Sequence, residues 1–154
     1  MNIAIEPLRQ ADHHAAINVI KRTITISQGK IYPKELINAF CHKYDFDNFR
    51  KRTQEIECFV AKENKNILGI IGLRNNELRT FFVDPDNQGK GIGRKLYDYL
   101  ENEARKKGIA KLFLQGSPLG EPIYTKFGFK KLRNIVKEKA GVKYTDAYME
   151  KALI

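Results

Sequence analysis

The sequence predicts an α/β fold of the α+β kind, with a mixed sheet that carries helices on both faces. Three observations lead to this expectation. Strand-like segments occur at the start of the chain, where apolar and polar residues alternate, from residue 56 to 83, and again from residue 129. The stretches between them carry apolar residues at helical spacing. The 154 residues are 42% hydrophobic and 30% charged, which predicts one globular domain over residues 1–154.

The first third of the chain is expected to give one strand and two helices. Asn2–Leu8 alternates and is the first strand, and Asp12 is the expected N-cap of the first helix. Thr23–Ile31 is left open between the end of that helix and a loop. A Tyr-Pro pair at positions 32 and 33 opens a second amphipathic helix. Asp45–Thr53 is polar and is left unassigned.

Three strands in succession are expected next, forming a meander. They are Ile56–Lys62, Ile67–Arg74 and Glu77–Val83, separated by asparagine-containing turns. The middle strand is almost entirely apolar, which predicts that both of its faces are buried. Pro85 ends the third strand because proline cannot donate to a sheet.

The last part of the chain begins with the strongest helical pattern, Gly91–Lys107. Its apolar stripe comprises Ile92, Leu96, Tyr99, Leu100 and Ala104. The strand Lys111–Gln115 follows after a helical crossover and is therefore expected to lie parallel to the third strand of the meander. A short helix at Glu121–Phe127 precedes two closing strands, Phe129–Arg133 and Val142–Lys151, with a connection between them.

Charge and composition limit the classes of partner. The net charge of +10 favours an anionic partner, although a charged surface that keeps the protein soluble is the alternative. Nucleic acid is not expected, because the basic residues form no arm or aromatic-interleaved stripe. The chain has no apolar run long enough for a membrane span and no signal-peptide core, so a cytoplasmic location is expected. Two cysteines and three histidines without ligand spacing predict no metal. A homodimer is left open.

The segment from Leu78 to Lys95 carries the clearest chemical signal. An apolar strand leads into a turn containing Gly89, Gly91 and Gly93 and then into a helix. Backbone N–H groups and the helix dipole favour an anion there, and glycine keeps Cβ atoms away from it. A Walker A loop is excluded by spacing, and a dinucleotide fingerprint is excluded because residue 94 is Arg. A purely structural glycine turn is the alternative.

Two segments resemble the signatures of the GNAT superfamily of N-acyltransferases. Gln88–Gly93 (QGKGIG) is similar to the acyl-CoA signature Gln/Arg-x-x-Gly-x-Gly/Ala, and Tyr124–Phe129 (YTKFGF) is similar to Tyr-x-x-x-Gly-Phe. The order of elements also agrees with that fold from Asn2 to the end of the chain. The resemblance implies a GNAT-like fold, in which a mostly antiparallel sheet contains one splayed parallel strand pair. It further implies that acetyl-CoA, or a longer acyl-CoA, binds between those two strands.

The same resemblance implies which residues hold the donor. Strand backbone would pair with the pantetheine arm, one amide would polarise the thioester carbonyl, and the glycine turn would hold the pyrophosphate with basic residues nearby. Ser117 stands where many members carry an asparagine. The implied residues are Phe81, Phe82, Val83, Gln88, Gly89, Lys90, Gly91, Ile92, Gly93, Arg94, Ser117 and Lys126.

For the chemistry, the resemblance implies direct acetyl transfer to a primary amine within a ternary complex. Tyr124 matches the family tyrosine that protonates the leaving thiolate, and a phenol with a pKa near 10 suits that role. A core tyrosine is the alternative. Glu77 stands where some members carry a catalytic glutamate and is the candidate base, with an exposed strand-start glutamate as the alternative. Arg79 would hold Glu77 ionised or bind an acidic group of the substrate.

No motif identifies the acceptor. Its site is expected to be walled by residues 23–46, by the loops near Glu77 and by the last hairpin, with Tyr32 either a wall residue or a packing aromatic. Two other classes of function are left open. One is an acyl-CoA sensor without turnover, and the other is a basic nucleic-acid-binding module.

Overall fold

The computed structural model describes residues 2–154 and contains a seven-stranded sheet in the order β1-β2-β3-β4-β5-β7-β6. The pairing of β4 with β5 is parallel, and the other five pairings are antiparallel, as predicted. The strands are β1 (Ala4–Pro7), β2 (Glu57–Glu63), β3 (Asn66–Arg74), β4 (Glu77–Val83), β5 (Lys111–Gly116), β6 (Lys130–Lys139) and β7 (Val142–Ala152). The helices are α1 (His13–Ile26), α2 (Lys34–His42), α3 (Phe46–Arg52), α4 (Ile92–Lys106) and α5 (Glu121–Lys126).

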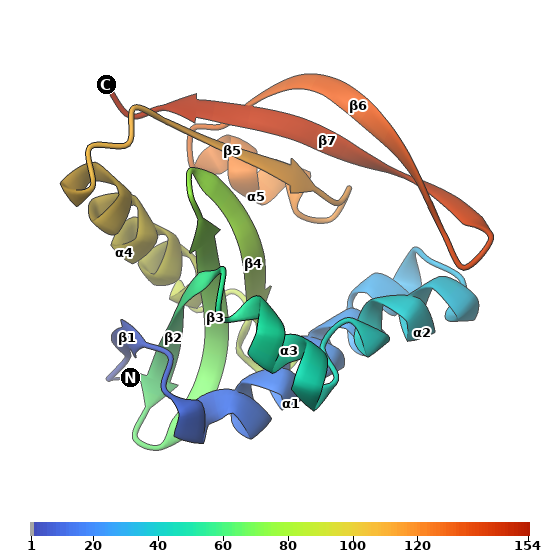
Figure 1. Cartoon of the computed structure of the whole chain (residues 1–154), viewed down its shortest axis with the longest axis horizontal. Coiled ribbons are helices and arrows are strands. Elements are labelled where there is room, and N and C mark those ends of the chain that lie inside the picture. Colours follow the sequence, from blue (N-terminus) through green and yellow to red (C-terminus); the bar gives the residue numbers. More distant parts are fainter. Residues whose placement is uncertain (1) are drawn as a thin grey trace.

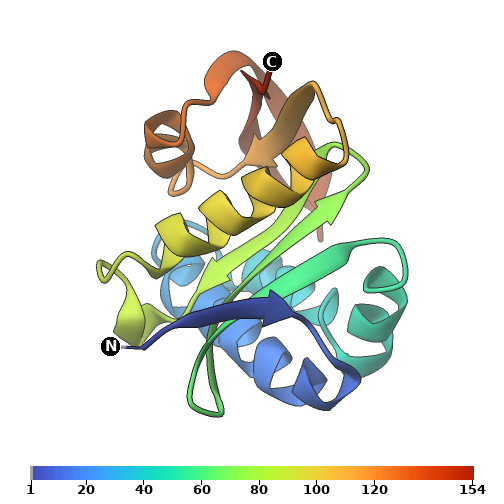
Figure 2. The ribbon, with the colours of Figure 1, turned by 90° about the vertical axis from the view of Figure 1, so that its left-hand side faces the viewer.

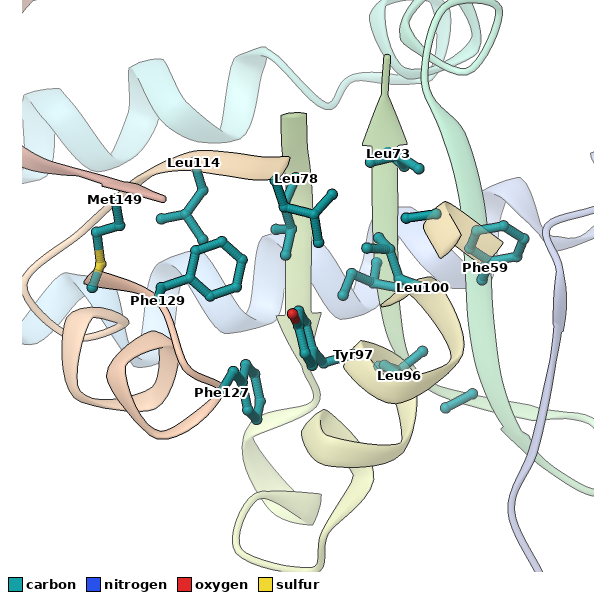
Figure 3. Packing of buried hydrophobic residues seen from close by; sticks show 14 of the residues in the cluster. Phe59, Leu73, Leu78, Leu96, Tyr97, Leu100, Leu114, Phe127, Phe129 and Met149 are labelled. Carbon is teal, nitrogen blue, oxygen red and sulfur yellow. The ribbon is translucent and has the colours of Figure 1, made fainter. Parts of the chain in front are cut away.

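Helices cover both faces of the sheet, as Figures 1 and 2 show. Helix α4 packs on one face over a core that includes Leu96, Leu100 and Phe59, and α1, α2 and α3 pack on the other face. The predicted stripe of α4 omitted Tyr97, which is 1% exposed and stacks on Phe127 with ring centroids 4.5 Å apart (Figure 3). Tyr99 is only half-buried at the edge of the same core.

The parallel pair β4–β5 is joined only at its beginning. Glu77 is paired with Phe113, and the backbone N–H of Phe113 donates to the carbonyl of Asn76 at 3.1 Å. No later pair of the two strands is in register within residues 2–154, and β5 turns away from β4 in Figure 1. The sheet is therefore opened beside β4 after Glu77, which is the splay that the GNAT resemblance implies.

A β-bulge lies in β4 at Arg79. Thr80 is paired with Gly72 and Leu78 with Leu73, so Arg79 has no opposite residue on β3. Strict alternation would place Leu78 and Phe81 on opposite faces, whereas the bulge brings both side chains to the core under α4. The bulge therefore re-aims the half of β4 that borders the opening.

Several segments differ from the sequence-based expectation. The predicted connection between the closing strands is wrong over residues 134–139, because β6 runs to Lys139 and the turn is only Ala140-Gly141, with φ of 52° and 74°. The undecided segments 23–31 and 45–53 contain the end of α1 and all of α3. Asp12 precedes α1, but its side chain accepts from the backbone N–H of Arg9 at 2.9 Å, so it closes the preceding turn.

No helix within residues 2–154 combines the length and the apolar character that crossing a bilayer requires.

Candidate active site

A cleft of about 770 Å³ lies where β4 and β5 separate. Its walls come from α1, α2 and α3, from β4 and the glycine turn, from the loop between β5 and α5, and from the β6–β7 hairpin. The predicted site residues that line it are Glu77, Phe81, Phe82, Val83, Gln88, Gly89, Gly91, Ile92, Gly93, Ser117 and Tyr124. Lys90, Arg94 and Lys126 are exposed and do not line it.

The glycine turn leaves the start of α4 open. Gly89 and Gly91 have φ of 79° and 83°, a region that residues with a side chain rarely adopt. Gly91 is the N-cap of α4, and no side chain within residues 2–154 caps the first amides of that helix. A Cβ atom at Gly89 or Gly91 would meet nothing within 4 Å. Free amides at the positive end of a 15-residue helix suit the phosphates of a nucleotide cofactor.

An ion pair between buried Asp84 and half-exposed Arg22 fixes the corner that leads into this turn. The carboxylate of Asp84 is 2.9 Å from Nη1 of Arg22 on α1, and Nη2 of Arg22 is 3.0 Å from Asp86. Asp84 also accepts from the backbone N–H of Asp86 at 3.2 Å and from Asn87 Nδ2 at 2.9 Å. Because Asp84 is buried, these contacts tie the turn rigidly to α1.

The backbone of β4 presents free groups to the opening. The carbonyl of Val83 accepts from Gln88 Nε2 at 3.0 Å and from Thr23 Oγ1 at 3.2 Å, so it points away from β3. Backbone groups alternate between the two edges of a strand, which directs the N–H and C=O of Phe81 to the same side. Since β5 is not paired there, Phe81 offers a donor and an acceptor to a bound molecule.

Two glycines make room for the ring of Tyr124. A Cβ atom at Gly116 would lie 2.9 Å from Cε2 of that ring, and one at Gly120 would lie 2.8 Å from the same atom. The loop before α5 is held by Ser117, whose hydroxyl oxygen accepts from the N–H of Gly120 at 3.3 Å. Burial and the nearby charge of Asp146 raise the pKa of Tyr124 well above its usual value. The phenol therefore stays protonated at neutral pH.

Among residues 2–154, the carboxylates that line the cleft are those of Glu77 and Asp146. Glu77 is half-buried at the start of β4, with Oε1 3.6 Å from Nη1 of Arg79. Asp146, on the inward side of β7, lies 3.1 Å from Nζ of Lys137. The sequence-based analysis missed Asp146. Asp146 lies on the predicted closing strand Val142–Lys151. Of the alternate positions 142, 144 and 146, which share one face of that strand, it is the acidic one, and this signal could have identified it.

The far end of the cleft is cationic and aromatic. Burial, together with the charges of Lys139, Arg52, Lys137 and Arg79, lowers the pKa of Lys43 to about 8. Residues 23–46 and the last hairpin were expected to wall the acceptor site, but the sequence analysis singled out neither these lysines nor Arg52, because nothing in the sequence places them side by side.

A cluster of three rings joins α2 to the β6–β7 hairpin. Tyr32, Phe40 and Tyr144 meet edge to face with centroids 5.3–6.0 Å apart. Figure 1 shows the hairpin reaching over α2 at this end. Within residues 2–154 no group of three or more His, Cys, Asp or Glu side chains is placed to hold a metal ion.

Comparisons with known proteins agree with this geometry. A family model described as "Acetyltransferase (GNAT) domain" matches residues 27–153. An uncharacterized N-acetyltransferase of Escherichia coli (strain K12), YafP, is 22% identical over 148 residues, which is 96% of this chain and 95% of that protein.

Solved structures resemble the whole chain. A GCN5-related N-acetyltransferase from Rhodopseudomonas palustris has a TM-score of 0.92 at 21% identity, covering 99% of this chain and 97% of its own. The PaiA N-acetyltransferase of Thermoplasma acidophilum, solved in complex with coenzyme A, has a TM-score of 0.84 at 26% identity, covering 99% of each chain.

Proposed function

The chain belongs to the GNAT acetyltransferase family, and from this premise we propose that it transfers the acetyl group of acetyl-CoA directly to a primary amine in a ternary complex. One observation carries the proposal. The open start of α4, the unpaired edge of β4 and the ring of Tyr124 all face the same cleft. Each of the three suits a different part of an acyl-CoA thioester.

The donor would be held mainly by backbone. The amides from Gln88 to Arg94 would receive the pyrophosphate, since positive φ at two glycines leaves that surface bare. The outward N–H and C=O of Phe81 would pair with the amide-bearing pantetheine arm. The coenzyme A complex of the 26% identical PaiA protein supports this type of ligand. Lys90, Arg94 and Lys126 would act only at the rim.

Acetyl-CoA supplies an activated acyl group and a thiolate leaving group. The chain would supply a base, an acid and an oxyanion donor. Glu77 or Asp146 would take one proton from the acceptor amine as its nitrogen bonds to the acyl carbon. Tyr124 would give its proton to the departing sulfur as the carbon–sulfur bond breaks. An N–H on the open edge of β4 would face the thioester oxygen, and such a donor lowers a barrier by ~3 kcal/mol.

A titration followed by a turnover assay tests the proposal. Acetyl-CoA should bind the protein, and free thiol should appear only when an amine acceptor is added. Tyr124→Phe should lower kcat by about 10² or more while leaving acetyl-CoA binding unchanged. Tyr148→Phe is the matched control, because the Tyr148 hydroxyl donates to Glu150 at 2.8 Å and does not line the cleft. Donor binding without thiol release for any amine would instead indicate a sensor.

A further inference from the structure

The acceptor half of the cleft holds a cluster of cations from four separate elements. Lys43 follows α2, Arg52 ends α3, Arg79 forms the bulge of β4, and Lys137 lies on the inward side of β6. All four line the cleft, and Lys139 approaches Lys43 from the next inward position of β6. The low pKa of Lys43 reports how strongly these charges and burial oppose its protonated form.

The protein itself provides too few anions for this cluster. Among residues 2–154, the carboxylates lining the cleft are Glu77 and Asp146, each within 4 Å of one cation, Arg79 or Lys137. Lys43 and Arg52 form no ion pair with any described residue.

The lack of a nearby anion is clearest for Arg52. Its Nε atom is buried and has no hydrogen-bond partner within the described chain. Its guanidinium lies 5.2 Å from the centre of the Tyr44 ring. Burying part of a cation without a counterion costs desolvation free energy, which an anionic ligand would offset.

These cations lie away from the phosphate turn. Arg79 and Val83 are separated by four residues of extended chain, roughly 13 Å, and the glycine turn lies beyond Val83. Lys43 and Arg52 belong to the helices on the face of the sheet opposite α4. The cluster is therefore not positioned for the pyrophosphate of the donor.

We propose that the acceptor is a small amine that also carries a carboxylate, held by Arg52 and Arg79 with its amine directed toward Glu77 and Asp146. This inference rests on the proposed acetyl transfer. Arg52 and Arg79 both line the cleft, and the charges of both act on Lys43 and Tyr44. A carboxylate bound between them would accept charge-assisted hydrogen bonds from their guanidinium groups. The rings of Tyr32, Phe40 and Tyr144 suit an apolar portion of the same molecule. An amino acid with an apolar side chain has all three features.

Matched pairs of amines test the proposal. L-phenylalanine and phenethylamine differ by the carboxylate alone, and we expect kcat/KM to be about 10- to 100-fold higher for L-phenylalanine. Arg52→Met and Arg79→Met should each reduce this preference toward unity without changing acetyl-CoA affinity. Lys143→Met is the charge-matched control, because Lys143 points outward on β7 and does not line the cleft. It should retain the full preference.

A second measurement does not depend on turnover. In the presence of coenzyme A, calorimetry should show that N-acetyl-L-phenylalanine binds more tightly than N-phenethylacetamide, and that Arg52→Met removes the difference. Equal binding, or no binding of N-acetyl-L-phenylalanine at millimolar concentration, overturns the inference. If the kcat/KM for phenethylamine equals that for L-phenylalanine, the proposed acetyl transfer is supported and the proposed carboxylate requirement is wrong. If tight binding occurs without any thiol release, the ligand class stands and the proposed reaction falls.

Discussion

Gly120→Ala should impair catalysis by displacing the ring of Tyr124. Gly120 has a φ of −82°, which alanine adopts without strain, so the backbone tolerates the change. The added Cβ atom would lie 2.8 Å from Cε2 of Tyr124, and the other nearest atoms, at 3.4 Å and 3.5 Å, belong to the same ring. The ring must therefore move by roughly 0.6 Å to reach ordinary contact. Because a 1 Å misplacement at a reacting group costs ~10²-fold, we expect kcat to fall about 10-fold.

Thiol release measured at saturating acetyl-CoA gives this kcat. Gly29→Ala is the matched control, because a Cβ atom there meets nothing within 4 Å and the residue does not line the cleft. The double variant Gly120→Ala with Tyr124→Phe decides the mechanism. If Gly120 acts only through the Tyr124 hydroxyl, the double variant is no slower than Tyr124→Phe alone. Multiplied losses in the double variant, or a normal kcat in Gly120→Ala, would refute the assignment of Tyr124 as the acid.

Three further results are expected. Arg22→Met should weaken acetyl-CoA binding by about one order of magnitude in calorimetry, because the Asp84 corner loses its tie to α1; an unchanged Kd in a folded variant would contradict that role. Lys62→Met should lower the free energy of unfolding by about 2 kcal/mol in urea titrations at pH 7, because Asp12, 7% exposed, loses the 2.9 Å ion pair with Nζ of Lys62 and keeps only its contacts with Arg9. Although burial by itself raises the pKa of Asp12, the bonds from Lys62 and from the Arg9 amide bring it below 3.8, so the wild type should lose this contribution only as the pH falls through that lowered pKa. The KM for a carboxylate-bearing acceptor should rise as the pH passes about 8, because Lys43 is deprotonated there. Burial and the neighbouring cations of α3, β4 and β6 lower its pKa to about 8. A KM that stays constant from pH 7 to 9 would show that Lys43 does not contact the acceptor.

Local signals predicted the residues at the end of the cleft where we propose that the donor binds. Gly89, Gly91 and Tyr124 belong to short motifs whose spacing is set by one turn or one helix. Such motifs can be recognised from the linear sequence alone. The periodicity of β4 and the crossover to β5 likewise predict a parallel pair, and the structure confirms it. The pair opens immediately after Glu77 because β5 pairs along its length with β7. This pairing is a property of the assembled sheet and has no local sequence signal.

For the proposed acceptor site, the sequence indicated only the segments expected to wall it, which are residues 23–46, the loops near Glu77 and the last hairpin, and not which side chains meet there. These side chains come from distant parts of the chain: Lys43 follows α2, Arg52 ends α3, and Lys137 and Asp146 lie on β6 and β7. They line one cleft because the sheet order places the last hairpin over α2. The Lys-rich stretch of β6 also hid its strand, since its inward positions include lysine and few apolar residues. The bulge at Arg79 belongs to the same class of feature, because no residue type near it signals an unpaired position.

The most direct test of the account is mass spectrometry after a single turnover. Enzyme in excess of acetyl-CoA would be mixed with a pool of apolar amino acids and their decarboxylated amines. The masses of the protein and of the small molecules would then be measured separately. We expect one equivalent of free coenzyme A, one equivalent of acetyl group on an amine, and no acetyl group on the protein. Intact acetyl-CoA, free acetate in place of an acetylated amine, or an acetylated protein would contradict direct transfer in this cleft.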